Sequence, residues 1–340
     1  MHLAVFKTNY LGDNVVFLPV VQTLRARYPD WRITLITAPA VAPLYAADIA
    51  VADLLTVEPE TLKRMWHHPA AFGGWWSELR RRKIDASLVS YDQSSVAHAL
   101  AWLAGGCPRV GAAELRIRLQ GTLTQDVSRS KEWSIARWNW EIARTLVAAL
   151  GKSDWPAEPS VPDLSHLLAG ASVVPQHVVI HAGSKWEYTR WPQERFIELA
   201  GRLARDHEVW WIYAPELPPC AVPARVRLVE SQDLGTLVRL LAGAALFVGN
   251  NSGPMHIANA LGVPLVVISG PTDFAWDPAW HDGRATVLRT AGLACLPCDK
   301  VPFAAGRCQN AAEPLACMKR WSVSAVEAAC RNALDRVVGA

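Results

Sequence analysis

The chain has 340 residues, more than one hydrophobic core usually holds, so we expect two domains. Hydrophobic residues make up 51% of it and charged residues 19%, a composition that excludes an intrinsically disordered chain. The formal net charge of +3 is too small to predict nucleic-acid binding, and no apolar stretch reaches the roughly 20 residues that a membrane-spanning helix needs.

The amino terminus, residues 1–7, has no cationic segment before a long apolar stretch. It therefore predicts a first buried strand and not a signal peptide. We expect a cytoplasmic protein whose basic residues can touch the inner face of a membrane. In that reducing compartment the seven cysteines are expected as thiols or metal ligands.

Short apolar strands alternate with amphipathic helices along the first half of the chain. Strands are predicted at residues 3–8, 33–36 and 86–89, and a helix at residues 15–28. Such alternation predicts a parallel sheet that helices cover on both faces.

A proline-rich tract at residues 156–162 interrupts this series and is followed by a second one. We place the domain boundary there, with domains at residues 1–158 and 159–340. The second series has predicted strands at 178–181, 208–213, 246–248 and 264–268, and helices at 193–206, 234–244 and 254–260. The chain is thus predicted to be an α/β protein of two Rossmann-like domains, with ligands beyond the carboxyl ends of the strands.

The first strand leads into the turn at residues 9–14. Gly12 permits a tight turn there, and Asp13 lies at the start of the next helix. Asp13 is either a helix cap or a base that takes a proton from a hydroxyl, and both interpretations stay open.

Three turns of the second domain carry polar groups suited to a diphosphate. In residues 181–192, Ser184 offers a hydroxyl, and Lys185 and Arg190 offer positive charge. Residues 249–256 open a helix whose free N–H groups and positive dipole end attract an anion. The turn at residues 270–273 could complete the wall of the pocket.

Other signatures are missing from the sequence. It has no G-x-G-x-x-G after the first strand, no phosphate-binding loop of the kinase type and no G-x-S-x-G. No D-x-D pair is present either, so a divalent metal that holds the nucleotide is not indicated.

These turns, in this order, resemble the family-nine glycosyltransferases, the heptosyltransferase group of lipopolysaccharide synthesis. The match covers most of the chain, and its most specific part is residues 251–264. The resemblance implies a GT-B fold, in which two Rossmann-like domains with parallel sheets face each other across a cleft. The acceptor is then expected on residues 1–158 and the nucleotide sugar on residues 159–340.

The resemblance also implies a metal-independent, inverting transfer, often of heptose from ADP-heptose, to a glycan such as lipopolysaccharide core. Asp13 matches the general base of the family. The expected acceptor-binding residues are Asn9, Gly12, Arg116 and Arg118, and the expected donor-binding residues are Ser184, Lys185, Arg190, Asn251, Ser252, Gly253, Pro254, Met255, His256 and Thr272.

Two positions depart from the family pattern. The family usually has aspartate where this chain has Asn251, and often lysine where it has Thr189. Lys185 or Arg190 would then have to supply the cation, and the identity of the donor is left open.

Four cysteines, Cys295, Cys298, Cys308 and Cys317, follow the pattern C-x₂-C-x₉-C-x₈-C in an insertion at residues 295–317. Four thiolates suit a tetrahedral zinc or iron site, which would be structural. The pattern resembles the cysteine-held iron insertion of the autotransporter heptosyltransferases, although related lipopolysaccharide enzymes carry cysteines here without an evident metal. Both interpretations stay open, and no cofactor is expected for catalysis.

Arginines and tryptophans are frequent in the first domain, at residues 80–83 and 116–140. They favour an anionic glycan acceptor, although most of the tryptophans are expected in the core. Two other functions stay open: a protein heptosyltransferase of the autotransporter type, and a non-catalytic nucleotide-sugar-binding protein.

Overall fold

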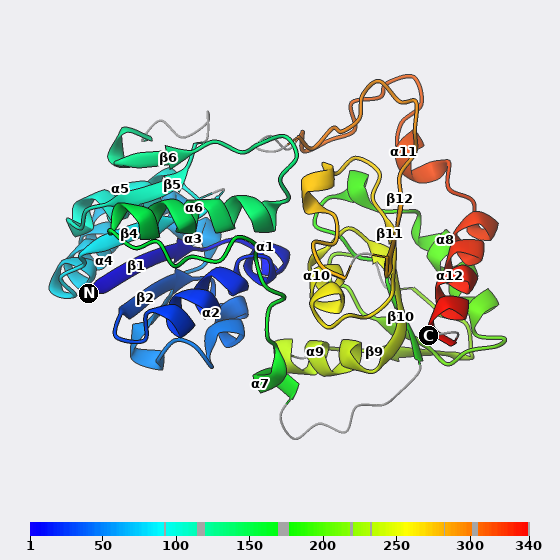
Figure 1. Cartoon of the computed structure of the whole chain (residues 1–340). Coiled ribbons are helices and arrows are strands. Elements are labelled where there is room, and N and C mark those ends of the chain that lie inside the picture. The colour runs from blue at the N-terminus through cyan, green and yellow to red at the C-terminus, as the bar shows by residue number, and fades with distance from the viewer. Residues whose placement is uncertain are drawn as a thin grey trace. The chain divides into compact units, whose positions relative to one another are not determined.

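The computed structural model describes residues 1–91, 93–113, 120–168, 177–217, 220–231, 233–281, 283–300 and 305–338. The chain divides into two compact units, Met1–Asp163 and Leu164–Ala340, each with its own sheet (Figure 1). The boundary predicted from the sequence, between residues 158 and 159, precedes this division by a few residues. Within the described ranges, no helix is long and apolar enough to cross a membrane.

The first unit has a six-stranded parallel sheet in the order β3-β2-β1-β4-β5-β6. Its strands are β1 (His2–Lys7), β2 (Arg32–Thr37), β3 (Leu54–Thr56), β4 (Ala86–Val89), β5 (Arg109–Ala112) and β6 (Gln125–Val127). All residues of β1 are buried, as expected for a central strand covered on both faces. The strand order reverses between β1 and β4, and open sheets bind ligands beyond the strand ends at such a switch point.

Helices cover both faces of this sheet (Figure 1). They are α1 (Leu11–Val15), α2 (Leu18–Arg27), α3 (Pro59–Arg64), α4 (Pro69–Arg81), α5 (Ser95–Ala104) and α6 (Ile135–Ala149). Apolar side chains of α3, α4 and α5 pack on Ala4, Phe6 and Val89 in one core layer. The alternate residues Leu3 and Val5 are fully buried as well, because α2 and α6 lie on the opposite face.

The second unit repeats the same topology. Its parallel sheet has the order β12-β11-β10-β7-β8-β9, which reverses between β7 and β10. The strands are β7 (His177–His181), β8 (Val209–Ile212), β9 (Val226–Val229), β10 (Ala244–Asn250), β11 (Leu265–Ile268) and β12 (Ala285–Leu288), and the helices are α7 (Ser165–Leu168), α8 (Gln193–Leu203), α9 (Leu234–Ala242), α10 (Gly253–Ala260), α11 (Ala316–Lys319) and α12 (Val323–Val338). Helices α8 and α12 pack on one face, around Phe196 and Cys330. The predicted α/β class with two Rossmann-like domains is confirmed.

One predicted helix is wrong in its bounds. The helix expected at residues 15–28 is two helices, α1 and α2, and α1 already begins at Leu11. Pro19 has no N–H to donate to the carbonyl of Val15, so the helical ladder cannot continue through it. The first helix, α1, starts directly after the switch point and carries Asp13 in its first turn.

Candidate functional site

The turn after β1 sets a buried lysine beside Asp13. Lys7 is the last residue of β1 and its side chain is fully buried (0% exposed), while 14% of the Asp13 side chain is exposed. Lys7 Nζ lies 3.8 Å from Asp13 Oδ1 and 5.7 Å from the centre of the Phe17 ring. The residue at the N-cap of α1 is Tyr10, so Asp13 occupies the first turn and not the cap position. A positive charge held this close favours the ionised carboxylate, the form that accepts a proton.

Buried amides and hydroxyls hold this turn in shape. Asn14 Nδ2 donates to the carbonyls of Asn9 (3.0 Å) and Tyr10 (2.8 Å). The hydroxyls of Tyr45 and Thr37 donate to Asn14 Oδ1 at 2.8 and 3.3 Å. Burial raises the pKa of Tyr45 well above its ordinary value, and the Asp13 charge acts in the same direction, so Tyr45 remains a neutral donor.

Gln93 joins the ends of β1 and β4 across the switch point. The N–H and hydroxyl of Thr8 donate to Gln93 Oε1 at 3.0 and 2.9 Å. Gln93 Nε2 in turn donates to Asn9 Oδ1. Asn9, expected to bind the acceptor, is thus 7% exposed and already bonded within the protein.

The turn after β7 is a tightly bonded loop. Gly183 is needed there because a Cβ atom would lie 2.6 Å from Ala214 Cβ. The hydroxyls of Ser184 and Thr189 lie 2.7 Å apart, and Thr189 Oγ1 also donates to the Trp186 carbonyl at 2.6 Å. Thr189 therefore fixes the loop.

Two cations of this loop differ in their surroundings. Arg190 Nε donates to the Ser184 carbonyl at 2.7 Å, so its guanidinium folds back over the loop. Lys185 is exposed, with Nζ 4.7 Å from the centre of the Trp186 ring. Lys185 is therefore the more accessible cation of the two predicted here.

The turn after β10 opens helix α10 without a side-chain cap. Ser252 is the N-cap residue, but its side chain makes no capping bond, in contrast to Ser94, Ser134 and Asp233 at α5, α6 and α9. Ser252 Oγ lies 3.3 Å from His181 Nδ1 instead. Pro254 has no N–H, and Met255 is fully buried, so Met255 can meet a ligand only through its backbone. The start of α10 thus offers backbone donors and a positive dipole end.

Two asparagines connect this turn to its neighbours. Asn250 Nδ2 donates to the Ala182 carbonyl at 2.7 Å, and Asn250 Oδ1 accepts from the Trp191 N–H at 2.9 Å. Asn251 Nδ2 donates to Ser269 Oγ (3.1 Å) and to the Trp276 carbonyl (3.0 Å). An aspartate at position 251 could not donate these two bonds.

Two histidines, His181 at the end of β7 and His256 in α10, are buried in the neutral form. Burial lowers the pKa of His181 and of His256 to about 4. His256 is 3% exposed, and its ring lies against Trp276 with 6.1 Å between ring centres. Near neutral pH these side chains therefore bring no positive charge to the turn.

The fourth predicted turn, residues 270–273, is braced by Arg289. Its guanidinium donates to the carbonyls of Ser269 (3.1 Å) and Thr272 (2.5 Å), and lies 2.5 Å from Asp277 Oδ1. Thr272 is half-buried. Arg289 is a cation at this edge of the sheet that the sequence analysis did not single out.

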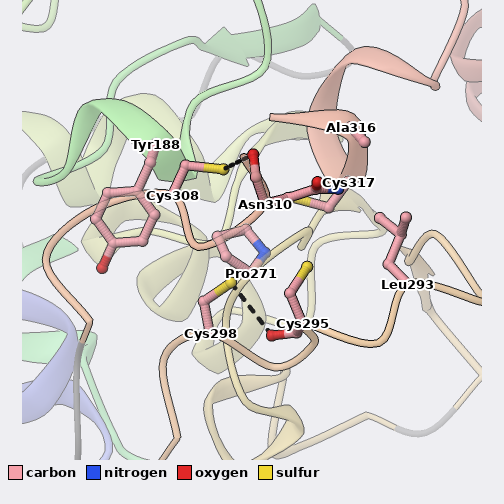
Figure 2. A pocket seen from close by; sticks show the side chains of 9 residues that line it. All are labelled: Tyr188, Pro271, Leu293, Cys295, Cys298, Cys308, Asn310, Ala316 and Cys317. Carbon is pink, nitrogen blue, oxygen red and sulfur yellow. Dashed lines mark hydrogen bonds between the residues drawn. The ribbon is translucent and has the colours of Figure 1, made fainter. Parts of the chain in front are cut away.

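The four predicted metal ligands line one pocket. Cys295, Cys298, Cys308 and Cys317 lie on its walls, together with Tyr188, Pro271, Leu293, Asn310 and Ala316 (Figure 2). Their sulfurs influence one another, since burial first, and then the neighbouring thiolates, raise the pKa of Cys317 to about 12. In the side-chain positions observed, no three His, Cys, Asp or Glu residues of the described part of the chain are set to hold a metal ion.

The arginines and tryptophans of the first unit, expected to favour an anionic acceptor, differ in their surroundings. Arg116 and Arg118 lie outside the described residues. Arg82 forms ion pairs within the unit, with Nη1 2.7 Å from Asp53 Oδ1 and Nη2 2.9 Å from Glu78 Oε1. Trp138 and Trp140 are core residues, each 1% exposed, whereas Trp76 is 42% exposed.

Sequence reasoning also missed Lys7 and Gln93. A lysine at the end of a strand usually reaches solvent, so only its position directly before the turn hinted at a role. Gln93 follows a predicted strand, and the carboxyl ends of neighbouring parallel strands meet at one edge of a sheet. That rule, applied to residues 90–93, could have found it.

Two doubly wound units of identical strand order, each with polar turns at its switch point, define an α/β protein of the GT-B fold. The chain belongs to glycosyltransferase family 9 (heptosyltransferase), whose family model matches residues 74–306. It is therefore a glycosyltransferase enzyme, as predicted.

Individual relatives agree with this family. The chain is 26% identical to lipopolysaccharide heptosyltransferase 1 of Pseudomonas aeruginosa over 320 residues, which covers 88% of this chain and 86% of the relative. The fold matches Escherichia coli heptosyltransferase WaaC, solved with ADP-2-deoxy-2-fluoro heptose, with a TM-score of 0.71 at 18% identity over 98% of this chain and 99% of the other. It also matches the iron-containing dodecameric glycosyltransferase TibC of enterotoxigenic E. coli with a TM-score of 0.60 at 17% identity, covering 99% of this chain and 76% of TibC.

Proposed function

We propose that this enzyme transfers heptose from ADP-heptose, with inversion, to a sugar of an anionic glycan such as lipopolysaccharide core. The similar proteins support the proposal, since one is named a lipopolysaccharide heptosyltransferase and another was solved with an ADP-heptose analogue. The observation that carries it in this chain is the partly exposed Asp13 carboxylate, held beside buried Lys7 at the switch point of the first unit.

Asp13 would act as the general base of the reaction. Its carboxylate accepts the proton of the acceptor hydroxyl while the hydroxyl oxygen attacks the anomeric carbon of the donor. Lys7 keeps the carboxylate ionised and in place, so Lys7 is a positioning residue. General bases of this kind contribute about 10²–10⁴-fold to a rate.

The second unit would hold the departing diphosphate. Backbone N–H groups at the start of α10 and the helix dipole meet its negative charge, together with the Ser252 hydroxyl. His256 is neutral and buried, so we assign it to the packing of α10. Lys185 is the exposed cation of the neighbouring turn and would supply the positive charge. Arg190, Gly253, Pro254 and Thr272 complete the proposed donor site.

Catalysis would need no metal or other cofactor, because the helix terminus and Lys185 take the place of a cation on the diphosphate. The reaction is expected to proceed at full rate without added Mg²⁺. A strong dependence on Mg²⁺ would show that the diphosphate is held in another way.

The donor can be identified by thermal-shift measurements with ADP, GDP, UDP and TDP sugars. At a concentration of about 100 Kd, ADP-heptose should stabilise the protein by about 2.7 kcal/mol, a Tm rise of roughly 5–10 °C. A selective response to another nucleotide would replace ADP-heptose as the donor. If none of the four sugars binds and no transfer to heptose-deficient core is found, both the proposed reaction and the proposed donor are wrong.

Because the proposed acceptor is a lipopolysaccharide, the enzyme is expected to act at the cytoplasmic face of a membrane. Trp66, Trp76 and Trp102 of the first unit are 49%, 42% and 53% exposed and are suited to an interfacial position. Binding to vesicles that contain anionic lipid, compared in the protein and in Trp102→Ser, tests this contact. Equal binding by both forms would remove Trp102 from the proposed contact.

A further inference from the structure

Two turns of the proposed donor site follow strands that are not neighbours in the sheet. The turn at residues 181–192 follows β7 and the turn at residues 270–273 follows β11, with β10 between these two strands. Strand pairing by itself therefore does not fix the distance between the two turns. A diphosphate that contacts both of them binds more tightly when this distance is already set, because no loop has to be ordered on binding.

Asp299 lies outside both turns and is bonded to each of them. Its carboxylate accepts a hydrogen bond from the Tyr188 hydroxyl of the first turn, with 2.5 Å between Oδ1 and the hydroxyl oxygen. Its backbone is bonded twice to the second turn. The Asp299 N–H donates to the Pro271 carbonyl (3.0 Å), and the Asp273 N–H donates to the Asp299 carbonyl (3.1 Å). Asp299 thus joins two turns that the sheet leaves separate.

Tyr188 is well placed to make this link. It lies in the short 3₁₀ helix η5 (Glu187–Thr189) and is only 6% exposed. Its side chain lines the same pocket as Pro271 of the second turn (Figure 2). A buried ring has little rotational freedom, so the direction of the Tyr188 hydroxyl is set by the packing around it.

Further bonds keep the carboxylate and the hydroxyl in place. The Ala305 N–H donates to Asp299 Oδ1 (3.0 Å), and the Gly306 N–H donates to the Tyr188 hydroxyl (3.3 Å). Hydrogen bonds to an ionised carboxylate are roughly twice as strong as bonds between neutral groups. The link between the two turns is therefore formed before any ligand binds.

The second turn is itself fixed from its other side. A Cβ atom on Gly270 would overlap Met318 Sδ, so α11 packs directly against the backbone of the turn. Arg289 donates to the carbonyls of Ser269 and Thr272, as described above. The turn at residues 270–273 is thus a firm support, to which Asp299 attaches the first turn.

We propose that Asp299 is a positioning residue of the donor site. Through Tyr188 it holds the turn at residues 181–192 at a set distance from the turn at residues 270–273, so that Lys185 and Thr272 meet one donor diphosphate together. This inference rests on the proposed function, which places the donor on these turns. The Asp299 carboxylate is bonded to Tyr188, so Asp299 acts through the turn and not on the reacting atoms.

Variants of the linked pair separate donor binding from the chemical step. Tyr188→Phe removes the hydroxyl and Asp299→Ala removes the carboxylate. Each should raise the Kd for ADP and the KM for the donor about fivefold, the effect of one hydrogen bond, while kcat changes less than about twofold. The double variant should bind ADP no more weakly than Asp299→Ala, because both changes break the same bond. Asp299→Asn keeps an oxygen that accepts from Tyr188 and should restore ADP binding to within about twofold of the wild type.

A second tyrosine–aspartate pair provides a matched control. In the first unit the Tyr28 hydroxyl donates to Asp154 Oδ1 at 2.6 Å. Tyr28→Phe should lower Tm by roughly 2–4 °C, as Tyr188→Phe does, yet leave the Kd for ADP unchanged. An equal rise of this Kd in both variants would show that ADP binding follows general stability, and the positioning role would be wrong.

The same measurements distinguish this inference from the function on which it rests. Wild-type affinity for ADP in folded Tyr188→Phe and Asp299→Ala would overturn the positioning role and leave the proposed function standing. If Asp299→Ala does not fold, Tyr188→Phe decides alone, because it keeps every backbone bond of the link. If the wild-type protein binds no ADP, the proposed function fails and the positioning role fails with it.

Discussion

The turn after β1 and the turn after β10 occupy equivalent places in their sheets but carry opposite chemistry. Each follows a central strand at a switch point, and each opens a helix. The first holds a charged pair, Lys7 and Asp13, with the lysine fully buried. The second has the neutral side chains of Ser252 and His256 and presents backbone N–H groups. Under the proposed function, one topology would serve proton transfer in one unit and anion binding in the other.

The largest effect should come from removing the charge of the first turn. Asp13→Asn should lower the rate of sugar transfer about 10²–10⁴-fold, because the amide cannot accept the proton. Calorimetry should show unchanged ADP binding, since the start of α10 is untouched. The exposed Asp30→Asn serves as control and should transfer sugar normally. Equal losses of transfer and ADP binding in Asp13→Asn would make Asp13 structural.

Acid should reveal the two neutral histidines of the second unit, His181 at the end of β7 and His256 in α10. Burial lowers the pKa of His181 and His256 to about 4, from an ordinary value of 6.5, so the unfolded chain binds more protons between these pH values. Stability is therefore full above pH 6.5 and falls as the pH drops toward 4, by roughly 1–3 kcal/mol for each histidine. Urea unfolding at pH 7 and pH 5 measures this loss.

Two matched variants test whether His256 causes this loss of stability in acid. His256→Gln should reduce the difference in unfolding free energy between the two pH values. The exposed His68→Gln should leave that difference as it is. The same pH dependence in all three proteins would show that His256 is not held neutral in the folded state.

A variant of Lys7 tests whether the Asp13 carboxylate depends on its neighbouring cation. In Lys7→Met the acid side of the pH–rate profile should move to higher pH, because a carboxylate without its neighbouring cation is harder to ionise. The rate at mildly acidic pH should fall about tenfold and recover as the pH rises.

The exposed pair of Lys63 and Glu60 provides the control. Its atoms are closer, with Nζ 3.0 Å from Oε1, but the side chains are 50% and 64% exposed. Solvent screens such pairs, so Lys63→Met should change neither the profile nor the stability noticeably. A uniform loss of rate at every pH in Lys7→Met would mean that Lys7 acts through packing alone.

The smallest effect is expected at Asn251. Asn251→Asp keeps the shape of the side chain but removes the bonds donated to Ser269 and Trp276. We expect a loss of about 1 kcal/mol, or 2–4 °C in Tm. Asn332→Asp on the exposed face of α12 should leave Tm unchanged. If Asn251→Asp melts like the wild type and binds ADP more tightly, the amide has no supporting role.

The central strands and the turns after them could be predicted from the sequence. Buried parallel strands such as β1 and β7 are continuous apolar runs, so both the strands and the turns at their carboxyl ends were located. The short outer strands β6 and β9 were missed, since exposed polar residues interrupt their apolar pattern. Only pairing with a neighbouring strand defines such segments.

The sequence by itself determined the doubly wound class, the location of Asp13 and the start of α10, and the spacing of the four cysteines, because local periodicity and turn residues encode them. Tertiary structure alone decided that Lys7 is buried against Asp13, that Gln93 bonds Asn9, and that the cysteine loop reaches Tyr188. These contacts join residues that strand pairing and burial bring together. The environment of a side chain depends on what packs around it, and a local sequence pattern does not contain that information.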